Sequence, residues 1–410
     1  MYGYSGYSWP PGSYGEGNSR TGGALNSSNL RPQAATTSKN PSVPARDITE
    51  GLDSPRVATF TIPLTTSGLN ADITDVQYIG SYNWMDGAQR TIIVPGSPPE
   101  WTNRPTPYVV REDTEERFID QNGYKIPTAP LLPLIASVNF YHASPGIRKP
   151  FDWSSVDIVT DRNGLRKILR WIRGEVDADF RIDLQLDGRK TVLFNRWEKR
   201  AKDYPPFSGS FGHNFEEATT TPARGCTGTT GHHRVVQYKF GGLKMVVRCE
   251  VDACLPAPPN QNPTRTSGWN AAPRSQMLPN GPGETPLLIH EGGNVVPQNF
   301  IAELKTISLK GLSAGRLRSD DIILQMFLSQ TPHLFMGVHD RGNFIQVQQS
   351  IVELNDHAAH LNTSLLKLRK VLEDVQKLCI LYGGRLSLIC QGGRLDVVQR
   401  SSFVYVPRLS

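Results

Sequence analysis

Two segments of the sequence, KMVVRCEVDACL (244–255) and NFIAELKTISL (299–309), decide the fold. Each is an apolar run with the two-residue alternation of a β-strand, because successive side chains of a strand point to opposite faces. Each also carries charged residues, which buried strands rarely hold without partners. The two segments therefore predict core strands that bring charged groups to one place.

The charged residues of each segment fall on one strand face, opposite an apolar face. In the first segment Glu250 and Asp252 share a face, and in the second Glu303 shares a face with Lys305. We expect the two strands to be neighbours, so that three carboxylates and a lysine converge. An ExD or an ExK alone is a weak signal, because solvated strand faces produce both patterns. The two patterns together, in this order, are a stronger signal.

Clustered carboxylates raise each other's pKa unless a cation compensates their charge. Oxygen ligands of this kind suit Mg²⁺ or Mn²⁺, and two such ions can hold the attacking and leaving oxygens of a phosphoryl transfer. A third stretch, SGSFGHNFEEA (208–218), offers Glu216 as a fourth carboxylate. Glu216 is equally readable as an acid favoured by the dipole of a helix N-terminus, and Glu217 competes for the same role. A nearby lysine, Lys305, suits an attacking water or a phosphate.

The order GHNFE, CEVD and AELKT resembles the GxxFE, ExD and ExK series of the DXO-type RNA decapping nucleases. IVTDRNGLRKIL (158–169) resembles the segment of that family in which an arginine precedes a helix. Residues 317–343 resemble its glutamine-containing helix and the strand that follows. The resemblance covers roughly residues 75–407. Departures are Asn163 in place of the usual glycine, His213 at an apolar or aromatic position, and a longer segment between ExD and ExK.

The resemblance implies an α+β fold of mixed and antiparallel sheets flanked by helices, with an active-site core like that of the PD-(D/E)XK nucleases. It implies hydrolysis at RNA 5′ ends in mRNA quality control: removal of a triphosphate, an incomplete cap or an NAD cap, with or without 5′→3′ exonuclease activity. It also implies two divalent ions, Mg²⁺ or Mn²⁺. The residues it assigns are Glu216, Glu250, Asp252 and Glu303 as metal ligands, Asp252, Glu303 and Lys305 as catalytic residues, and Arg162 and Gln325 as RNA contacts.

An alternative function is a non-catalytic RNA-binding or scaffold protein on the same fold, which stabilises a 5′→3′ exoribonuclease partner. The intact acid set favours the hydrolase, because a scaffold has no need of carboxylates around a metal. Arg162, Arg166, Arg170 and Arg173 share a helical face that fits an RNA channel and a solvated surface equally well. The run His232-His233-Arg234 fits a polar turn better than a metal site, since Mg²⁺ and Mn²⁺ prefer oxygen ligands.

The composition agrees with an anionic partner but does not require one. The 410-residue chain has a formal net charge of +6. Five cysteines without a CxxC pair argue against a disulfide framework and favour a reducing compartment. No apolar run is long enough to span a membrane, and the N-terminus has no signal pattern. We therefore expect a nuclear or cytoplasmic protein without a membrane partner.

The chain divides into a tail and one folded domain. Residues 1–55 are rich in Tyr, Gly, Ser and Pro and are expected to be disordered, and residues 56–410 form the nuclease-like domain. Residues 255–297 lack periodicity and are expected to be a flexible insert. Hairpin turns are predicted at Asp187-Gly188 and Gly241-Gly242. Helices are predicted at 165–174, 319–330 and 357–382, and a last strand at 403–407.

Overall fold

The computed structural model describes residues 42–52, 55–64, 67–144, 149–205, 208–256, 274–279, 284–317, 319–355 and 359–400. They belong to one unit of the chain, Pro41–Ser410. Within them the predicted α+β class is confirmed, with large mixed sheets and packed helices. Residues 1–41 of the expected tail and the expected strand at 403–407 lie outside the described residues.

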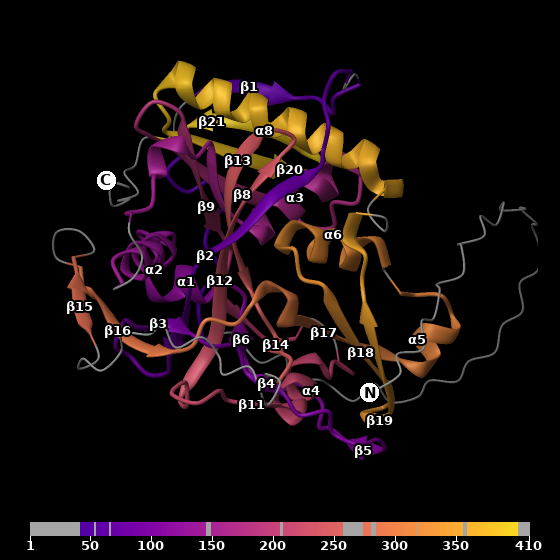
Figure 1. Ribbon diagram of the computed structural model, residues 1–410. Helices are drawn as coiled ribbons and strands as arrows, with labels where there is room; N and C mark the ends of the chain where they lie inside the picture. Colours follow the sequence, from indigo (N-terminus) through magenta and orange to yellow (C-terminus); the bar gives the residue numbers. More distant parts are fainter. Residues whose placement is uncertain are drawn as a thin grey trace, which may run out of the picture. The chain divides into compact units, whose positions relative to one another are not determined.

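A twelve-stranded mixed sheet forms the larger layer (Figure 1). Its strands are, in spatial order, β1 (Arg56–Phe60), β21 (Arg394–Gln399), β20 (Leu386–Gln391), β8 (Phe180–Asp187), β9 (Thr191–Trp197), β7 (Ile158–Asp161), β13 (Leu243–Glu250), β12 (Thr229–Phe240), β2 (Ile73–Met85), β3 (Thr91–Gly96), β16 (Leu287–Gly293) and β15 (Ser275–Leu278). The pairs β13–β7, β7–β9 and β16–β3 are parallel, and the others are antiparallel.

A seven-stranded sheet carries the second charged segment. Its order is β11 (Thr220–Thr221), β4 (Glu100–Trp101), β14 (Ala253–Cys254), β17 (Ile301–Ser308), β18 (His333–Asp340), β19 (Asn343–Ile351) and β5 (Tyr108–Val109). A separate short ladder joins β6 (Arg117–Phe118) to β10 (Lys202–Asp203). The AELKT segment is therefore an interior strand, since β17 has a partner on each side.

Helices cover both faces of the larger sheet. On one face α3 (Arg162–Ile172), α6 (Ser319–Ser329) and α8 (Asn362–Tyr382) share a core with the strands, and on the other face α2 (Leu132–His142) does. Figure 1 shows α8 running along α3, with α6 beside them. The remaining helical turns are α1 (Gln121–Lys125), α4 (Gly212–Thr219), α5 (Leu309–Ser313), η1 (Trp153–Ser155), η2 (Gln298–Phe300) and η3 (Ala359–Leu361).

Strand β13 is buried on both faces, which corrects the expectation of one apolar and one charged face. Met245 and Val247 pack into the core beneath α3, and Val246 packs into the core beneath α2. The charged Arg248 is also buried, because Asp161 neutralises it at 2.5 Å and 2.9 Å. A strand between parallel and antiparallel neighbours with helices on both faces has no solvated side for a row of charges.

The expected pairing of strands 244–252 and 299–306 is wrong for most of their length. Both edges of β13 are occupied, by β7 and by β12. After Glu250 the chain leaves the larger sheet, and its next two paired residues, Ala253 and Cys254, join β17 in the smaller one. The two charged segments therefore meet only where the chain passes from one sheet to the other.

The predicted turns and helices are present. The hairpin β8–β9 turns at Gly188 with φ of 60°, and β12–β13 turns at Gly241 and Gly242 with φ of 51° and 88°. At Gly241 a Cβ atom would also lie 2.2 Å from the carbonyl oxygen of Asn70, so no other residue fits there without displacement. Of the described helices, none has the length and apolarity needed to cross a membrane.

Parts of the expected tail and insert belong to the described structure. Arg181 donates from Nη1 to the carbonyl oxygens of Ile48 (3.1 Å) and Glu50 (2.5 Å). The guanidinium of Arg46 lies 4.5 Å from the centroid of the Trp197 ring. Within 255–297, β16 extends the larger sheet by pairing with β3. Hydrogen bonds to backbone carbonyls and pairing at the edge of the sheet hold these segments in place. Amino-acid composition does not reveal such contacts.

Candidate active site

Glu303 is the centre of the charged cluster. It lies on β17 and is almost fully buried, with 2% of its side chain exposed. Its carboxylate accepts hydrogen bonds from Lys305 Nζ, from Gln325 Nε2 and from Arg162 Nη1, the last at 3.0 Å. Burial alone would raise the pKa of Glu303, but the positive charges of Lys305 and Arg162 outweigh it and hold the pKa below its ordinary value.

Two helices bring the distant partners of Glu303 to it. Arg162 is the first residue of α3, directly after β7, and Gln325 lies on α6. The side chains of Leu324, Phe327 and Leu328 face the core of the larger sheet, so helical spacing directs Gln325 elsewhere, toward β17. Arg162 Nη1 also donates to Ser329 Oγ at 3.2 Å.

Asp252 lies in the passage between the two sheets. Its Oδ2 accepts the backbone N–H of Leu304 at 2.8 Å and is 3.8 Å from Lys305 Nζ. Burial and then the negative charge of Glu303 raise the pKa of Asp252 well above its ordinary value. Since Lys305 is shared with Glu303, Asp252 lacks a full counter-charge of its own.

Glu250 and Glu216 lie within electrostatic reach of the charged cluster, since the charge of Glu216 acts on both Glu250 and Asp252. Glu250 ends β13 and is exposed to solvent on one side, whereas Glu216 projects from α4, which packs against β17. The surrounding protein and then the charge of Glu216 raise the pKa of the Glu250 carboxyl. Glu217, the competing acid, instead pairs with Arg117 at 3.2 Å and is largely exposed. Of the two acids, Glu216 is therefore the one whose charge acts on Glu250.

The orientation of α4 depends on Asp113, which sequence reasoning missed. Its buried carboxylate accepts from the backbone N–H groups of Asn214 (2.9 Å) and His213 (3.3 Å) and from the hydroxyl of Ser210 (2.8 Å). The two backbone N–H groups belong to the first turn of α4. Such groups are normally capped by a residue that lies next to the helix in the sequence. The signal was not readable from the sequence because the capping residue lies a hundred positions upstream.

The donor set fits a hard divalent cation by its chemistry. Glu216, Glu250, Asp252 and Glu303 offer carboxylate oxygens only, the ligands that Mg²⁺, Mn²⁺ and Ca²⁺ prefer. Burial, and then the charge of Glu216 for Glu250 and of Glu303 for Asp252, raises the pKa of both carboxyls, so a bound cation would favour their ionised forms. The expected convergence of three carboxylates is not observed, however, because within the described ranges no three Asp, Glu, His or Cys side chains lie close enough together to hold a metal ion. Glu303 in particular is bonded to protein groups.

The structure bears on two further segments, the basic helix, which the sequence left undecided, and the run 232–234, for which it favoured a polar turn. Most cations of α3 pair with carboxylates: Lys167 with Glu198, Arg170 with Asp177, and Arg173 with Glu175 and Asp320. The run 232–234 lies inside β12 and is buried, so the polar turn was wrong. His232 Nδ1 is 2.7 Å from Asn83 Oδ1, and His233 stacks on Tyr82.

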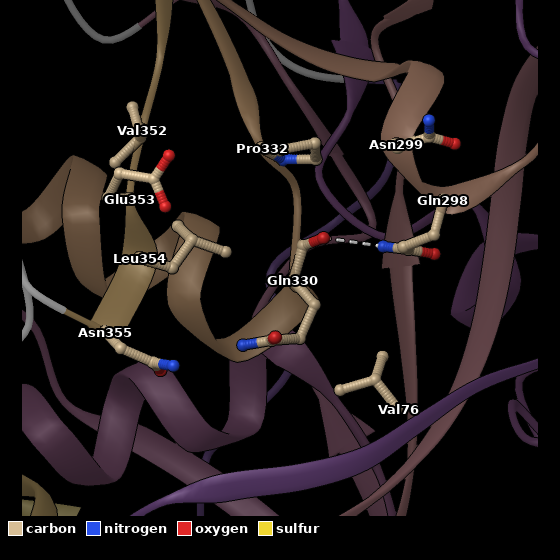
Figure 2. A pocket seen from close by; sticks show the side chains of 9 residues that line it. All are labelled: Val76, Gln298, Asn299, Gln330, Pro332, Val352, Glu353, Leu354 and Asn355. Carbon is tan, nitrogen blue, oxygen red and sulfur yellow. Dashed lines mark hydrogen bonds between the residues drawn. The ribbon is translucent and has the colours of Figure 1, made fainter.

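A cavity of about 510 Å³ is lined by Val76 and by residues of the segments 298–299, 330–332 and 352–355 (Figure 2). Gln298 and Gln330 lie in its wall, and the amide of Gln298 donates to the carbonyl oxygens of Ser329 (3.1 Å) and Gln330 (2.7 Å). Gln298 Oε1 accepts from Arg234 Nε at 2.7 Å. The Gln298 amide is thus committed to protein partners, and no residue assigned to the metal or to RNA lines this cavity.

The fold is found in solved structures. The chain is similar to S. pombe Rai1 at 14% identity, with 83% of this chain and 99% of that chain covered and a TM-score of 0.54. It is also similar to S. pombe Rai1 in complex with 3′-FADP (14% identity, 83% and 99% covered, TM-score 0.52). A third similar structure is Scheffersomyces stipitis Rai1 in complex with (3′-NADP)⁺ and calcium ion (13% identity, 84% and 93% covered, TM-score 0.53).

These likenesses define the class: the chain has the fold of the Rai1 proteins, which are structural members of the DXO family of decapping enzymes. The fold that the motifs implied is thereby confirmed. The sequence itself belongs to the family described as "Domain of unknown function (DUF8563)", whose profile matches residues 61–393. No curated protein matches the sequence.

Proposed function

We propose that the chain is a metal-dependent hydrolase of RNA 5′ ends. The observation that carries the proposal is the arrangement around Glu303 on a Rai1 fold. Residues from β17, α3 and α6, together with the passage after β13, converge on one buried carboxylate. Several acids, a lysine and an arginine gathered at one place are the groups that metal-assisted phosphate chemistry uses.

The proposed roles follow from charge and position. Glu216, Glu250, Asp252 and Glu303 would hold the divalent cations, which when bound supply an activated water and neutralise phosphate charge. Lys305 is a fixed positive charge beside Glu303 and Asp252, where it orients the attacking water or stabilises the phosphate. Arg162 and Gln325 already donate into the cluster and would turn their remaining donors toward the substrate.

The substrate class is the phosphoanhydride or phosphodiester linkage near an RNA 5′ end. Hydrolysis adds one water: its oxygen bonds to phosphorus while the bond from phosphorus to the leaving oxygen breaks. Two of the similar Rai1 structures hold 3′-FADP and (3′-NADP)⁺, which are dinucleotides with a pyrophosphate. We therefore include NAD-type caps among the proposed substrates, beside triphosphate and incomplete caps.

One experiment tests the function directly. Purified protein is incubated with 5′-triphosphate, unmethylated-cap and NAD-cap RNAs, with Mn²⁺ and with EDTA, and the released 5′ product is identified by mass. We expect release with Mn²⁺ and none with EDTA. Shortening of the RNA body in the same reactions reports the proposed 5′→3′ exonuclease step. No release from any of the three RNAs would contradict the proposal.

One observation favours the alternative of a non-catalytic RNA-binding scaffold for a 5′→3′ exoribonuclease. Glu303 is already neutralised by Lys305 and Arg162, as in a purely structural cluster. The two functions differ in the effect of metal. A hydrolase binds Mn²⁺ through these acids, so that mutation of Glu250 abolishes the stabilisation of the fold by Mn²⁺. A scaffold shows no Mn²⁺-dependent stabilisation at all.

A further inference from the structure

One cation of α3 differs from its neighbours. Arg162, Lys167, Arg170 and Arg173 each have a carboxylate partner at 3.0 Å or less. Arg166 has none: across the described residues it forms no ion pair, hydrogen bond or ring contact. The basic face that the sequence left undecided therefore separates into four paired cations and one unpaired arginine.

Arg166 lies beside the carboxylate cluster. It follows Arg162 by one helical turn, and side chains four positions apart on a helix are neighbours, with Cβ atoms about 5–6 Å apart. Helix α3 packs against α6, which bears Gln325. The charges that act on Arg166 are those of Arg162, Glu303, Asp321 and Arg170, so it belongs to the same electrostatic environment as the proposed site.

Arg166 is only partly buried. Burial and then the like charge of Arg162 lower the pKa of Arg166. Among the described residues, Arg170 Nε and Arg173 Nη1 are buried without a hydrogen-bond partner. No nitrogen of Arg166 is buried in this way. A half-buried cation without a direct ion pair is costly to the fold, even with Glu303 and Asp321 acting at a distance, and an anionic ligand reduces that cost.

We propose that Arg166 binds a phosphate group of the RNA strand, next to the carboxylate cluster. A guanidinium presents paired donors that match phosphate oxygens, and Arg166 has all of its donors free among the described residues, whereas Nη1 of Arg162 is held by Glu303 and Ser329. The inference rests on the proposed function only for its choice of RNA as the anion. It adds a substrate contact that none of the motifs marks.

The test measures binding without hydrolysis. A 5′-phosphorylated single-stranded RNA is titrated in EDTA at several salt concentrations against wild type, Arg166→Ala, Arg166→Lys and the control Arg170→Ala, which loses the same charge from the same helix. We expect Arg166→Ala to weaken binding about tenfold and to reduce the slope of log K against log salt by about 0.7, the value for one phosphate contact on a single strand. Arg166→Lys should keep the slope, and Arg170→Ala should resemble wild type.

Thermal unfolding separates binding from structure. Removal of an unpaired, half-buried charge should leave the melting temperature of Arg166→Ala unchanged or higher, whereas a packing role predicts a lower one. Unchanged affinity and slope in Arg166→Ala, equal losses in Arg166→Ala and Arg170→Ala, or no RNA binding by wild type would each overturn the proposal. An Arg166-dependent slope in a protein that hydrolyses no RNA would refute the proposed function alone.

Discussion

Arg162 Nη1 lies 3.0 Å from Glu303 Oε2, although the two residues are 141 positions apart. This contact joins the start of α3 in the larger layer to β17 in the smaller sheet. It also makes Glu303 the counter-ion of two cations, since Lys305 bonds to the same carboxylate. The energetic role of Glu303 therefore differs from that of an acid crowded only by other acids.

Replacement of Glu303 by Gln should destabilise the metal-free protein. From the sequence alone, loss of one clustered acid would be expected to relieve repulsion, but here it leaves Lys305 and Arg162 without their anion. The glutamine retains hydrogen bonds, so we expect a cost of about 2 kcal/mol in urea unfolding. The control Glu353→Gln, at an exposed position, should be neutral. A stability equal to wild type for Glu303→Gln would contradict the counter-ion role.

Replacement of Lys305 by Ala should remove hydrolysis and spare RNA binding. A single electrostatic group of this kind is worth roughly 100- to 1000-fold in rate. Lys310, five residues later and exposed, gives the matched control Lys310→Ala. The comparison is made by single-turnover product release in Mn²⁺, with RNA affinity measured separately. Equal rates in the two variants would remove Lys305 from the proposed mechanism.

Replacement of Asp113 by Ala should weaken metal use through α4. The helix loses the carboxylate that accepts its first-turn amides, at a cost of about 1–2 kcal/mol. Because α4 carries Glu216, the Mn²⁺ concentration for half-maximal activity should rise, while the rate at saturating Mn²⁺ falls less. Glu115→Ala, an exposed change in the same segment, is the control. A lower melting temperature with an unchanged Mn²⁺ requirement would show that Asp113 supports the fold only.

The fold should lose stability in mild acid because of His232 and His233. Burial, followed by Arg234 for His232 and Arg248 for His233, lowers the pKa of each imidazole well below 6.5. The unfolded chain therefore binds protons that the folded protein does not, so stability is full above pH 6.5 and falls as the pH decreases below it. The slope approaches about 1.4 kcal/mol per pH unit for each histidine. Urea unfolding of wild type and His232→Gln at pH 5 to 8 should show a shallower slope in the variant.

Deletions should separate the two parts of the N-terminal segment. Loss of residues 1–41 should change neither stability nor hydrolysis of short RNAs. Loss of residues 1–52 also removes the carbonyl acceptors of the buried Arg181, and we expect a cost of about 1–3 kcal/mol. Calorimetry of the two truncated proteins measures the difference. Identical melting temperatures would show that Ile48 and Glu50 contribute nothing to the fold.

Local features of the chain could be predicted because local residues determine them. Gly188 and the Gly241-Gly242 pair specify their turns through backbone conformations that glycine alone adopts freely. The alternation within each charged segment likewise predicted a β-strand, which β13 and β17 confirm. It did not show that β13 and β17 belong to different sheets, because a period of two contains no information about which strands pair.

The site was predictable as a set of residues but not as a geometry. The two-residue spacing of Glu303 and Lys305 placed both side chains on one strand face, where they can be in contact. The contacts of Glu303 with Arg162 and Gln325 depend on how α3 and α6 pack, which is a tertiary property. The same holds for Asp113, whose helix cap lies far from it in sequence. Long-range hydrogen bonds between polar side chains leave no periodic trace in the chain.

The passage of the chain from one sheet to the other has a consequence for how such a site diverges. Glu250 belongs to the larger sheet and Glu303 to the smaller one, and Cys249, Val251 and Ile301 pack together as a buried apolar group where the chain passes between the sheets. This apolar group links the two strands that carry the acids. Conservative substitutions in it would therefore offer a way to shift one strand against the other, and with it the proposed metal site, without replacing any of the proposed ligands.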